Sequence, residues 1–160
     1  MVVDLGTGDG RAVLQRAAAE PAALVIGIDA VAAAMAESSR RADRRGPANA
    51  LFLAAGAEDL ECTPLAGQVD VATVAFPWGS LLRGVVGLDG AALCGIASLI
   101  APTGRLEVLA SVIASDRLDG LDYLDASSEL RMQRAWSATG LDLRTMRQAT
   151  IEELVASGST

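Results

Sequence analysis

The sequence predicts an α/β fold with a doubly wound, mostly parallel sheet. Apolar runs rich in β-branched residues alternate with segments of helical periodicity along the chain. This alternation is typical of parallel strands joined by helical crossovers that cover both faces of a sheet. The chain has 160 residues, of which 51% are hydrophobic, and this suffices to bury a core. We therefore expect a single domain over residues 1–160.

The individual elements follow from periodicity and from turn residues. Residues 1–5 and 24–29 have the composition of buried strands. Between them, Val13, Leu14 and Ala17 lie on one face of an expected helix. The further elements expected are a helix at 31–45, strands at 50–54 and 69–76, a helix at 89–100, a strand at 105–113, a helix at 128–139, a strand at 141–146 and a helix at 151–156.

Both ends of this predicted domain are abrupt. The first strand begins at Met1, and no strand follows the last helix to close the outer edge of the sheet. We therefore expect a domain that is truncated at both ends and that lacks its last edge strand.

Composition excludes several kinds of chemistry. The net charge of −7 excludes a basic field over the whole surface and leaves only local basic patches for nucleic acid. The chain has no histidine and its 13 basic residues are all arginine, which excludes histidine triads, histidine metal ligands and lysine Schiff bases. Cys62 and Cys94 form no CxxC pair, so we expect no metal site and expect both thiols to fill apolar space in a reducing compartment.

Targeting segments are not expected either. No stretch of the length needed to cross a bilayer is both apolar and uncharged, and the chain begins with an apolar strand instead of a charged leader. We therefore expect a cytoplasmic protein without a membrane partner.

A glycine-rich loop stands between the first strand and the first helix. Gly6 and Gly8 allow turn geometry and close approach of a ligand, and Gly10 allows tight packing of helix and strand. Asp29 ends the second strand, where a carboxylate accepts hydrogen bonds from ribose hydroxyls. These positions indicate a nucleoside-containing cofactor, and ordinary loop chemistry is the alternative.

The loop departs from the dinucleotide fingerprint G-x-G-x-x-G. Counted from Asp4 it has the form D-x-G-x-G-x-G, which resembles motif I of class I S-adenosylmethionine-dependent methyltransferases. That resemblance implies that the methionine end of S-adenosylmethionine lies along the loop and its ribose on the acid of the second strand. It also implies that Ala57 and Glu58, after the third strand, frame the adenine.

The fourth predicted strand ends in the turn FPWGS at residues 76–80. Ligands of open α/β sheets bind outside the carboxyl ends of the strands, so Trp78 is expected near the transferable methyl group as a stacking platform for a flipped-out base. The turn has no Asn or Asp to accept from an exocyclic amine, which makes a ring nitrogen the better target. Attack by a ring nitrogen needs no general base. The alternative is that Trp78 is a core aromatic.

Four segments together resemble one family: VVDLGTGDGR, VIGIDA, ALFLAAGAEDL and FPWGSLLRGVVG. They are similar to the Kam-type 16S rRNA (adenine-N1) methyltransferases, which confer aminoglycoside resistance. The resemblance implies a 16S rRNA partner within the 30S subunit and Trp78 as the catalytic base-stacking residue. We expect the protein to be a monomer, although no sequence feature carries this expectation. It implies cofactor contacts from these motifs, at Asp4, Gly6, Thr7, Gly8, Gly10, Asp29, Ala30, Ala57, Glu58, Pro77 and Ser80.

A second tryptophan of that family follows a Ser/Thr pair, and this chain ends at Ser159 and Thr160. Trp136 lies on an earlier predicted helix, and we expect it in the core. Phosphate contacts require local arginines, of which Arg83 beside the tryptophan turn is the leading candidate. The other candidates are Arg131, Arg134, Arg144 and Arg147, and a group near the end of the second helix, Arg40, Arg41, Arg44 and Arg45. For this second group the alternative is that the arginines offset the helix dipole and solvate an exposed helix face.

Two other functions remain open at this point. The acidic surface and the few aromatic residues favour a methyltransferase that acts on a small molecule. The abrupt ends favour a fragment that binds S-adenosylmethionine without activity.

Overall fold

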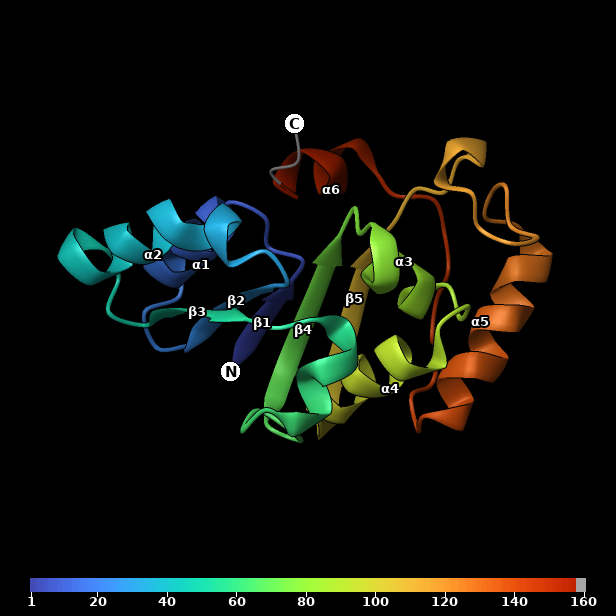
Figure 1. Cartoon of the computed structure of the whole chain (residues 1–160), viewed down its shortest axis with the longest axis horizontal. Coiled ribbons are helices and arrows are strands. Elements are labelled where there is room, and N and C mark those ends of the chain that lie inside the picture. The colour runs from blue at the N-terminus through green and yellow to red at the C-terminus, as the bar shows by residue number, and fades with distance from the viewer. Residues whose placement is uncertain (158–160) are drawn as a thin grey trace.

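The computed structural model describes residues 1–157 and contains one sheet of five parallel strands (Figure 1). Its order is β3-β2-β1-β4-β5, so the chain builds outward from β1 first to one side and then to the other. The crevice at this reversal, between β1 and β4, is where open α/β sheets bind ligands. The strands are β1 (Val2–Leu5), β2 (Val25–Asp29), β3 (Ala50–Ala54), β4 (Val69–Ala75) and β5 (Ile100–Leu109).

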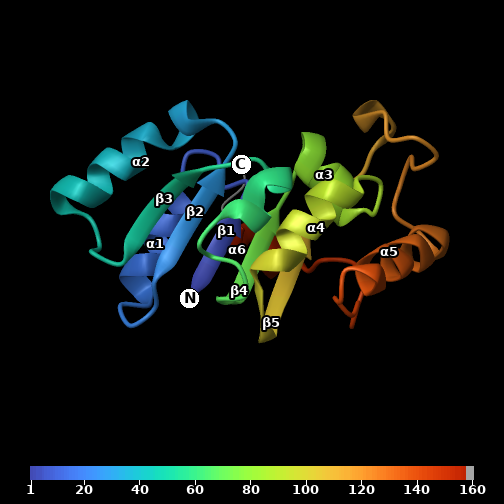
Figure 2. The ribbon, with the colours of Figure 1, turned by 60° about the horizontal axis from the view of Figure 1, so that its bottom comes forward.

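Helices cover both faces of the sheet, which confirms the doubly wound fold. In Figure 2, α4 lies in front of β4 whereas α1 lies behind the other half of the sheet. Alternate residues of each strand face opposite layers: Val2 packs in the cluster with α1, and Val3 packs in the cluster with α4. The helices are α1 (Arg11–Ala19), α2 (Ala32–Arg45), the 3-10 helix η1 (Ala57–Cys62), α3 (Gly79–Val85), α4 (Gly90–Leu99), the 3-10 helix η2 (Ala114–Asp116), α5 (Ala126–Ala138) and α6 (Ile151–Ala156).

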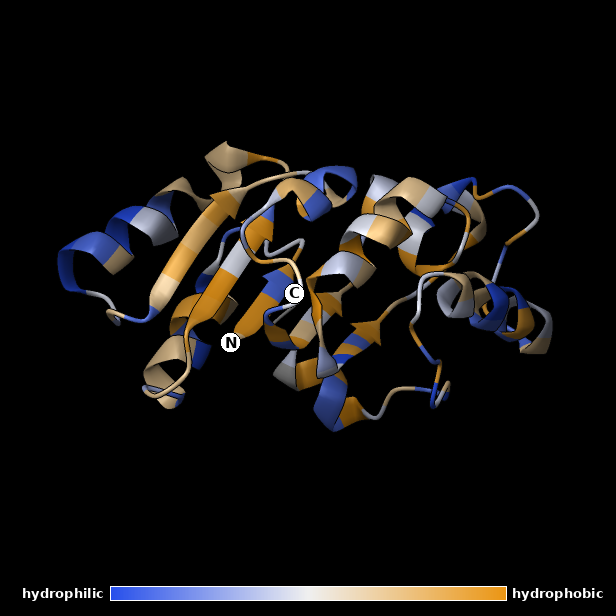
Figure 3. Cartoon of the chain, turned by 90° about the horizontal axis from the view of Figure 1, so that it is seen from below, coloured by the Kyte–Doolittle hydropathy of each residue, from blue (hydrophilic) through white to orange (hydrophobic). Residues whose placement is uncertain are grey.

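Hydropathy follows this layering. Figure 3 shows the strands largely apolar and the outer turns of α2 polar. Val3, Val25 and Val69 have no exposed surface. Strands that are apolar on both sides are what a parallel sheet between two helical layers requires.

The outermost helix α5 is anchored by Trp136. Only 5% of this residue is exposed, and its ring Nε1 donates a hydrogen bond to the Val85 carbonyl at 3.0 Å. The expectation that Trp136 belongs to the core is therefore confirmed. Because the bond ties α5 to the end of α3, it holds the helix at the side of the sheet.

Two predicted elements differ from the structure. The strand expected at 141–146 is wrong: within the described residues this segment pairs with no strand. Leu141, Leu143 and Met146 are half-buried against the core while the residues between them are largely exposed, so packing alone produces the alternation. The strand expected at 105–113 instead runs from Ile100 to Leu109, so both of its predicted ends are wrong. It begins earlier because β5 accommodates Pro102 and Gly104 in a register irregularity against β4.

Three further findings concern local features. Helix α3 was not predicted, and it begins directly after Trp78.

Cys62 and Cys94 are both exposed, so the expectation that they fill apolar space is wrong. Among the described helices none is by itself long and apolar enough to span a membrane; α3 and α4 pass only as a pair bent by 79°.

Candidate functional site

A cavity of about 180 Å³ opens at the carboxyl ends of β1, β2 and β4. Seven of the predicted site residues line it: Gly6, Asp29, Ala30, Ala57, Pro77, Trp78 and Ser80. The rest of the lining, which the sequence did not single out, is mainly apolar: Leu5, Ile28, Val31, Ala55, Leu60, Phe76, Gly79 and Leu81. Their common feature is a position at or just beyond the end of a strand, which is the signal that would have found them.

The glycine loop is held rigidly against β2. The N–H groups of Gly6 and Thr7 both donate to the Ile28 carbonyl, at 2.8 and 3.1 Å. Gly8 has a φ of 57° and a Cβ there would meet no atom within 4 Å, so the backbone conformation, and not space, requires glycine. Gly10 has a different reason, because a Cβ there would collide with the ring of Phe52 on β3.

Asp29 ties this loop to the end of β2. Its Oδ2 accepts the Gly8 N–H at 2.9 Å, and its Oδ1 accepts the Val31 N–H at 2.8 Å. Each carboxylate oxygen has a second acceptor site. The half-buried carboxylate is therefore oriented by two backbone donors and can still accept hydrogen bonds from a vicinal diol in the cavity.

The start of α1 is not arranged to hold a pyrophosphate. Three loop N–H groups are already used, because Gly6, Thr7 and Gly8 donate to protein oxygens. The Asp9 carboxylate accepts the Arg11 N–H at 3.0 Å, and this hydrogen bond lowers the pKa of Asp9. The other oxygen of Asp9 forms an ion pair with the Arg11 guanidinium at 2.5 Å, so the side chain of the first helical residue is engaged as well. The loop favours a nucleoside without phosphates.

Asp4, the acid that precedes the glycines, lies outside the cavity lining. Its Oδ1 accepts the Thr73 hydroxyl at 2.9 Å between the neighbouring strands β1 and β4. Burial raises the pKa of the Asp4 carboxyl above its ordinary value, and the hydrogen bond from Thr73 only partly opposes this rise. Asp4 therefore supports the strand beneath the loop.

This shift predicts a pH-dependent effect of Asp4→Asn. A carboxyl with a raised native pKa stabilises the fold below its unfolded pKa, and this contribution is lost as the pH rises through the native pKa. Asp4→Asn has no such carboxyl to ionise, so its stability relative to the parent chain increases as the pH rises from about 4, the unfolded pKa, through the raised native pKa of Asp4. Urea unfolding at several pH values measures the difference, with the exposed Asp43→Asn as control. A difference in unfolding free energy that is independent of pH would contradict the prediction.

The turn at residues 76–80 presents Trp78 to solvent. Phe76 has a φ of 46°, which is strained for a residue with a side chain and costs roughly 1–3 kcal/mol. Its N–H donates to the Leu109 carbonyl on β5 at 2.7 Å, and Pro77 after it is buried. Trp78 follows with 77% of its surface exposed at the rim of the cavity, so the core alternative for this residue is wrong.

Ser80 and Glu58 approach each other beside the cavity. The Ser80 hydroxyl donates to Glu58 Oε2 at 3.5 Å and so links α3 to η1. Ala57 is buried against Gly95 of α4, whose lack of a side chain allows this contact. Glu58 is exposed and its free oxygen remains available to a ligand.

Arg83 does not line the cavity. It lies on α3 with 38% of its side chain exposed, and its guanidinium is 4.0 Å from the Asp119 carboxylate. Over residues 1–157, no group of three or more acidic, Cys or His side chains is placed to hold a metal ion. Ser159 and Thr160 lie outside the described residues.

Comparisons with known proteins agree on one family. A family model described as "NpmA: 16S rRNA (adenine(1408)-N(1))-methyltransferase" matches residues 1–160. The 16S rRNA (adenine(1408)-N(1))-methyltransferase of Streptoalloteichus tenebrarius is 41% identical over 106 residues, which are 64% of this chain and 48% of that protein. The chain thus spans about half the length of the curated relatives it matches.

Solved structures give the same result. The 16S rRNA methyltransferase KamB superposes with a TM-score of 0.84 at 31% identity, over 98% of this chain and 75% of that chain. A mutant 16S rRNA (adenine(1408)-N(1))-methyltransferase from Catenulisporales acidiphilia, solved with the cosubstrate S-adenosylmethionine, has a TM-score of 0.80 at 29% identity, over 90% of this chain and 69% of that one.

Proposed function

The chain belongs to the NpmA family of 16S rRNA (adenine(1408)-N(1))-methyltransferases, and we propose on that premise that it methylates N1 of an adenine in the decoding site of 16S rRNA. The methyl donor is S-adenosylmethionine, and the methylated ribosome is resistant to aminoglycosides. Residues 1–160 act as one cofactor-binding domain. The substrate is the 30S subunit, so the protein works in the cytoplasm, and it works as a monomer.

The cavity suits a cofactor with a ribose but no phosphate. Asp29 accepts the ribose hydroxyls on oxygens that Gly8 and Val31 already orient. Gly6, which lines the cavity, leaves room for the amino-acid end along the loop. Ala57, also in the lining, frames the adenine together with the exposed Glu58 beside the cavity. The start of α1 disfavours a dinucleotide, because the N–H groups of Gly6, Thr7, Gly8 and Arg11 already donate to protein oxygens and are not free for a pyrophosphate.

The reaction fits a chain that has no histidine. When bound, S-adenosylmethionine supplies an electrophilic methyl group on a sulfonium. The adenine N1 carries its lone pair outward and bears no proton, so the protein has no proton to remove before attack. The described residues then contribute position and exclusion of water, which are the usual sources of rate when no acid or base takes part.

Trp78 holds the base in this arrangement. Its ring stands at the cavity rim with 77% of its surface exposed, which leaves a face free for an extruded adenine. Pro77 is buried and Phe76 is bonded to β5, so the turn that carries the indole is anchored. Such stacking is worth about 1–3 kcal/mol per base.

The single observation that carries the proposal is the exposed indole beside a loop whose acid is oriented for a ribose. Purified 30S subunits incubated with the chain and methyl-labelled S-adenosylmethionine should gain one methyl group on an adenine N1 of 16S rRNA, located by mass spectrometry. Free adenosine serves as the small-molecule control and should gain none. Transfer to adenosine alone would favour a small-molecule methyltransferase. No transfer by folded, cofactor-bound chain would contradict the activity and leave only cofactor binding.

A further inference from the structure

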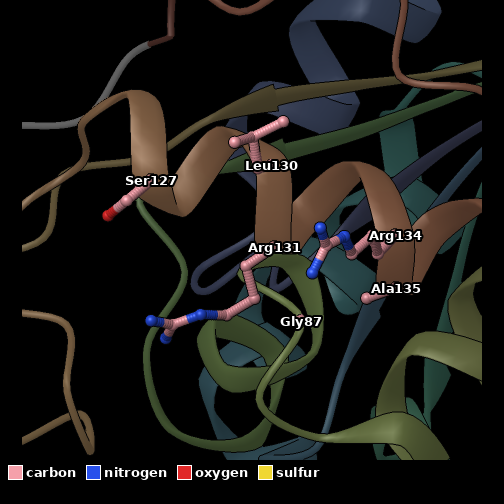
Figure 4. A pocket seen from close by; sticks show the side chains of 6 residues that line it. All are labelled: Gly87, Ser127, Leu130, Arg131, Arg134 and Ala135. Atoms are coloured by element: carbon pink, nitrogen blue, oxygen red, sulfur yellow. The ribbon is translucent and has the colours of Figure 1, made fainter.

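A second hollow lies apart from the cofactor cavity, between α5 and the loop that follows α3. It is an open groove of about 610 Å³ lined by Gly87, Ser127, Leu130, Arg131, Arg134 and Ala135. Figure 4 shows the side chains of Arg131 and Arg134 extending from α5 on the side of the Gly87 loop. None of these residues lines the cavity beside Trp78.

The floor of this groove is a fixed piece of backbone. Gly87 has a φ of 76°, and a Cβ there would lie 2.9 Å from the Cβ of Ala135. The loop therefore approaches α5 as closely as only glycine allows. Trp136 anchors the same part of α5 through its bond to Val85. The two arginines project from a rigid support.

Neither arginine has an acidic partner among residues 1–157. Arg131 donates to the Gly120 carbonyl at 3.2 Å, which leaves most of its five N–H donors free. Several other arginines are paired, as in Arg16 with Glu20 and Arg147 with Glu153. The described residues also include four further arginines without an acidic partner, which line neither hollow: Arg41, Arg44, Arg45 and Arg117. Arg131 and Arg134 are three residues apart on one helix, and like charges at this spacing repel each other. In a chain of net charge −7, two adjacent unpaired arginines mark a place for an anion.

The groove has the features of a site for a nucleic-acid backbone. Guanidinium groups bind phosphate oxygens in a bidentate geometry. Leu130, which is 56% exposed at the edge of the groove, offers an apolar contact to a sugar. Ser127 adds a hydroxyl, whose present partner is the Asp125 carboxylate. The acids nearest in sequence, Asp125 and Glu129, are not part of the lining.

Resting on the proposed function, we infer that this groove binds a phosphodiester of 16S rRNA through Arg131 and Arg134, away from the methylated base. The contact orients the 30S subunit without touching the cofactor. It also accounts for RNA binding by an acidic chain, because phosphate contacts depend on local arginines and not on net charge.

The test compares the full chain with the Arg131→Ala/Arg134→Ala variant in binding to 30S subunits over a series of salt concentrations. Each phosphate contact contributes about 0.7 to 0.9 to the slope of log affinity against log salt. The double variant should bind about tenfold more weakly at low salt and show a slope smaller by about 0.7 to 0.9, the contribution of one phosphate. The Arg131→Lys/Arg134→Lys variant, which keeps both charges, should recover most of the slope.

Arg105→Ala is the matched control, because Arg105 is an exposed arginine paired with Glu107 in the middle of β5, and it does not line the groove. It should leave the slope unchanged, and all variants should bind S-adenosylmethionine normally. The assignment of the groove as a phosphate site would be wrong if the double variant had the parental affinity and slope. It would also be wrong if the parent chain did not bind 30S subunits. Methyl transfer is measured in the same samples. If the double variant has a smaller salt slope but the parent chain transfers no methyl group, the groove is supported and the proposed activity is contradicted. If the parent chain transfers methyl groups but the double variant has the parental slope, the activity is supported and the groove is contradicted.

Discussion

Replacing Asp29 with alanine should weaken S-adenosylmethionine binding by roughly 100-fold or more. The change removes the acceptor of two ribose hydroxyls, and hydrogen bonds to a charged group are each worth about 1.5–3 kcal/mol. It also removes the acceptor of the Gly8 N–H at 2.9 Å, so the glycine loop loses one of its hydrogen bonds to β2 and keeps those of Gly6 and Thr7 to Ile28. Calorimetric titration with S-adenosylmethionine measures the loss.

Asp43→Ala is the control for this variant, because Asp43 is an exposed acid on α2 away from the cavity. It should bind the cofactor like the parent chain. Asp29→Asn keeps one carbonyl acceptor and should fall between the two. If Asp29→Ala is folded and retains the parental affinity, the ribose lies elsewhere and the assignment of this cavity is wrong.

Replacing Trp78 with alanine should lower methyl transfer to 30S subunits by roughly 100-fold while the affinity for S-adenosylmethionine stays within about twofold. Base stacking on an aromatic ring is worth about 1–3 kcal/mol, and misplacement of the reacting nitrogen adds to the loss. The ring is 77% exposed, so its removal leaves no cavity in the core. Trp78→Phe should retain most of the transfer, because a smaller ring still stacks.

Tyr123→Ala is the matched control for Trp78→Ala. Tyr123 is also an exposed aromatic residue, at 65%, but it does not line the cavity. Transfer by this variant should equal that of the parent chain. A parallel loss of cofactor affinity and transfer in Trp78→Ala would show that the indole has a structural role, and would remove it from the base-binding step.

The backbone of the site was predictable because its requirements are local. Glycines at 6, 8 and 10 adopt positive φ values, as expected for a turn between strand and helix, and Asp29 ends β2 as its spacing from the loop indicates. The position of Trp78 at the end of β4 follows from the same rule. These features depend on the chain within a few residues of each motif.

The parts that were missed depend on contacts between distant segments. The alternation of apolar and polar residues at 141–146 is equally compatible with a strand and with an extended segment that packs on the core. Only the tertiary structure distinguishes the two. The hydrogen bonds from Gly8 to Asp29 and from Arg11 to Asp9 could be seen only in the structure. The same holds for Arg131 and Arg134, whose lack of acidic partners in the described part of the chain is a fact of three-dimensional placement.

The most direct test of the account is a calorimetric titration of the unmodified chain with S-adenosylmethionine and, separately, with NAD. We expect saturable binding of S-adenosylmethionine at one site per chain and no measurable binding of NAD, because the N–H groups of Gly6, Thr7, Gly8 and Arg11 that a pyrophosphate would need already donate to protein oxygens. Tighter binding of NAD, or no heat from S-adenosylmethionine at saturating concentration, would contradict it.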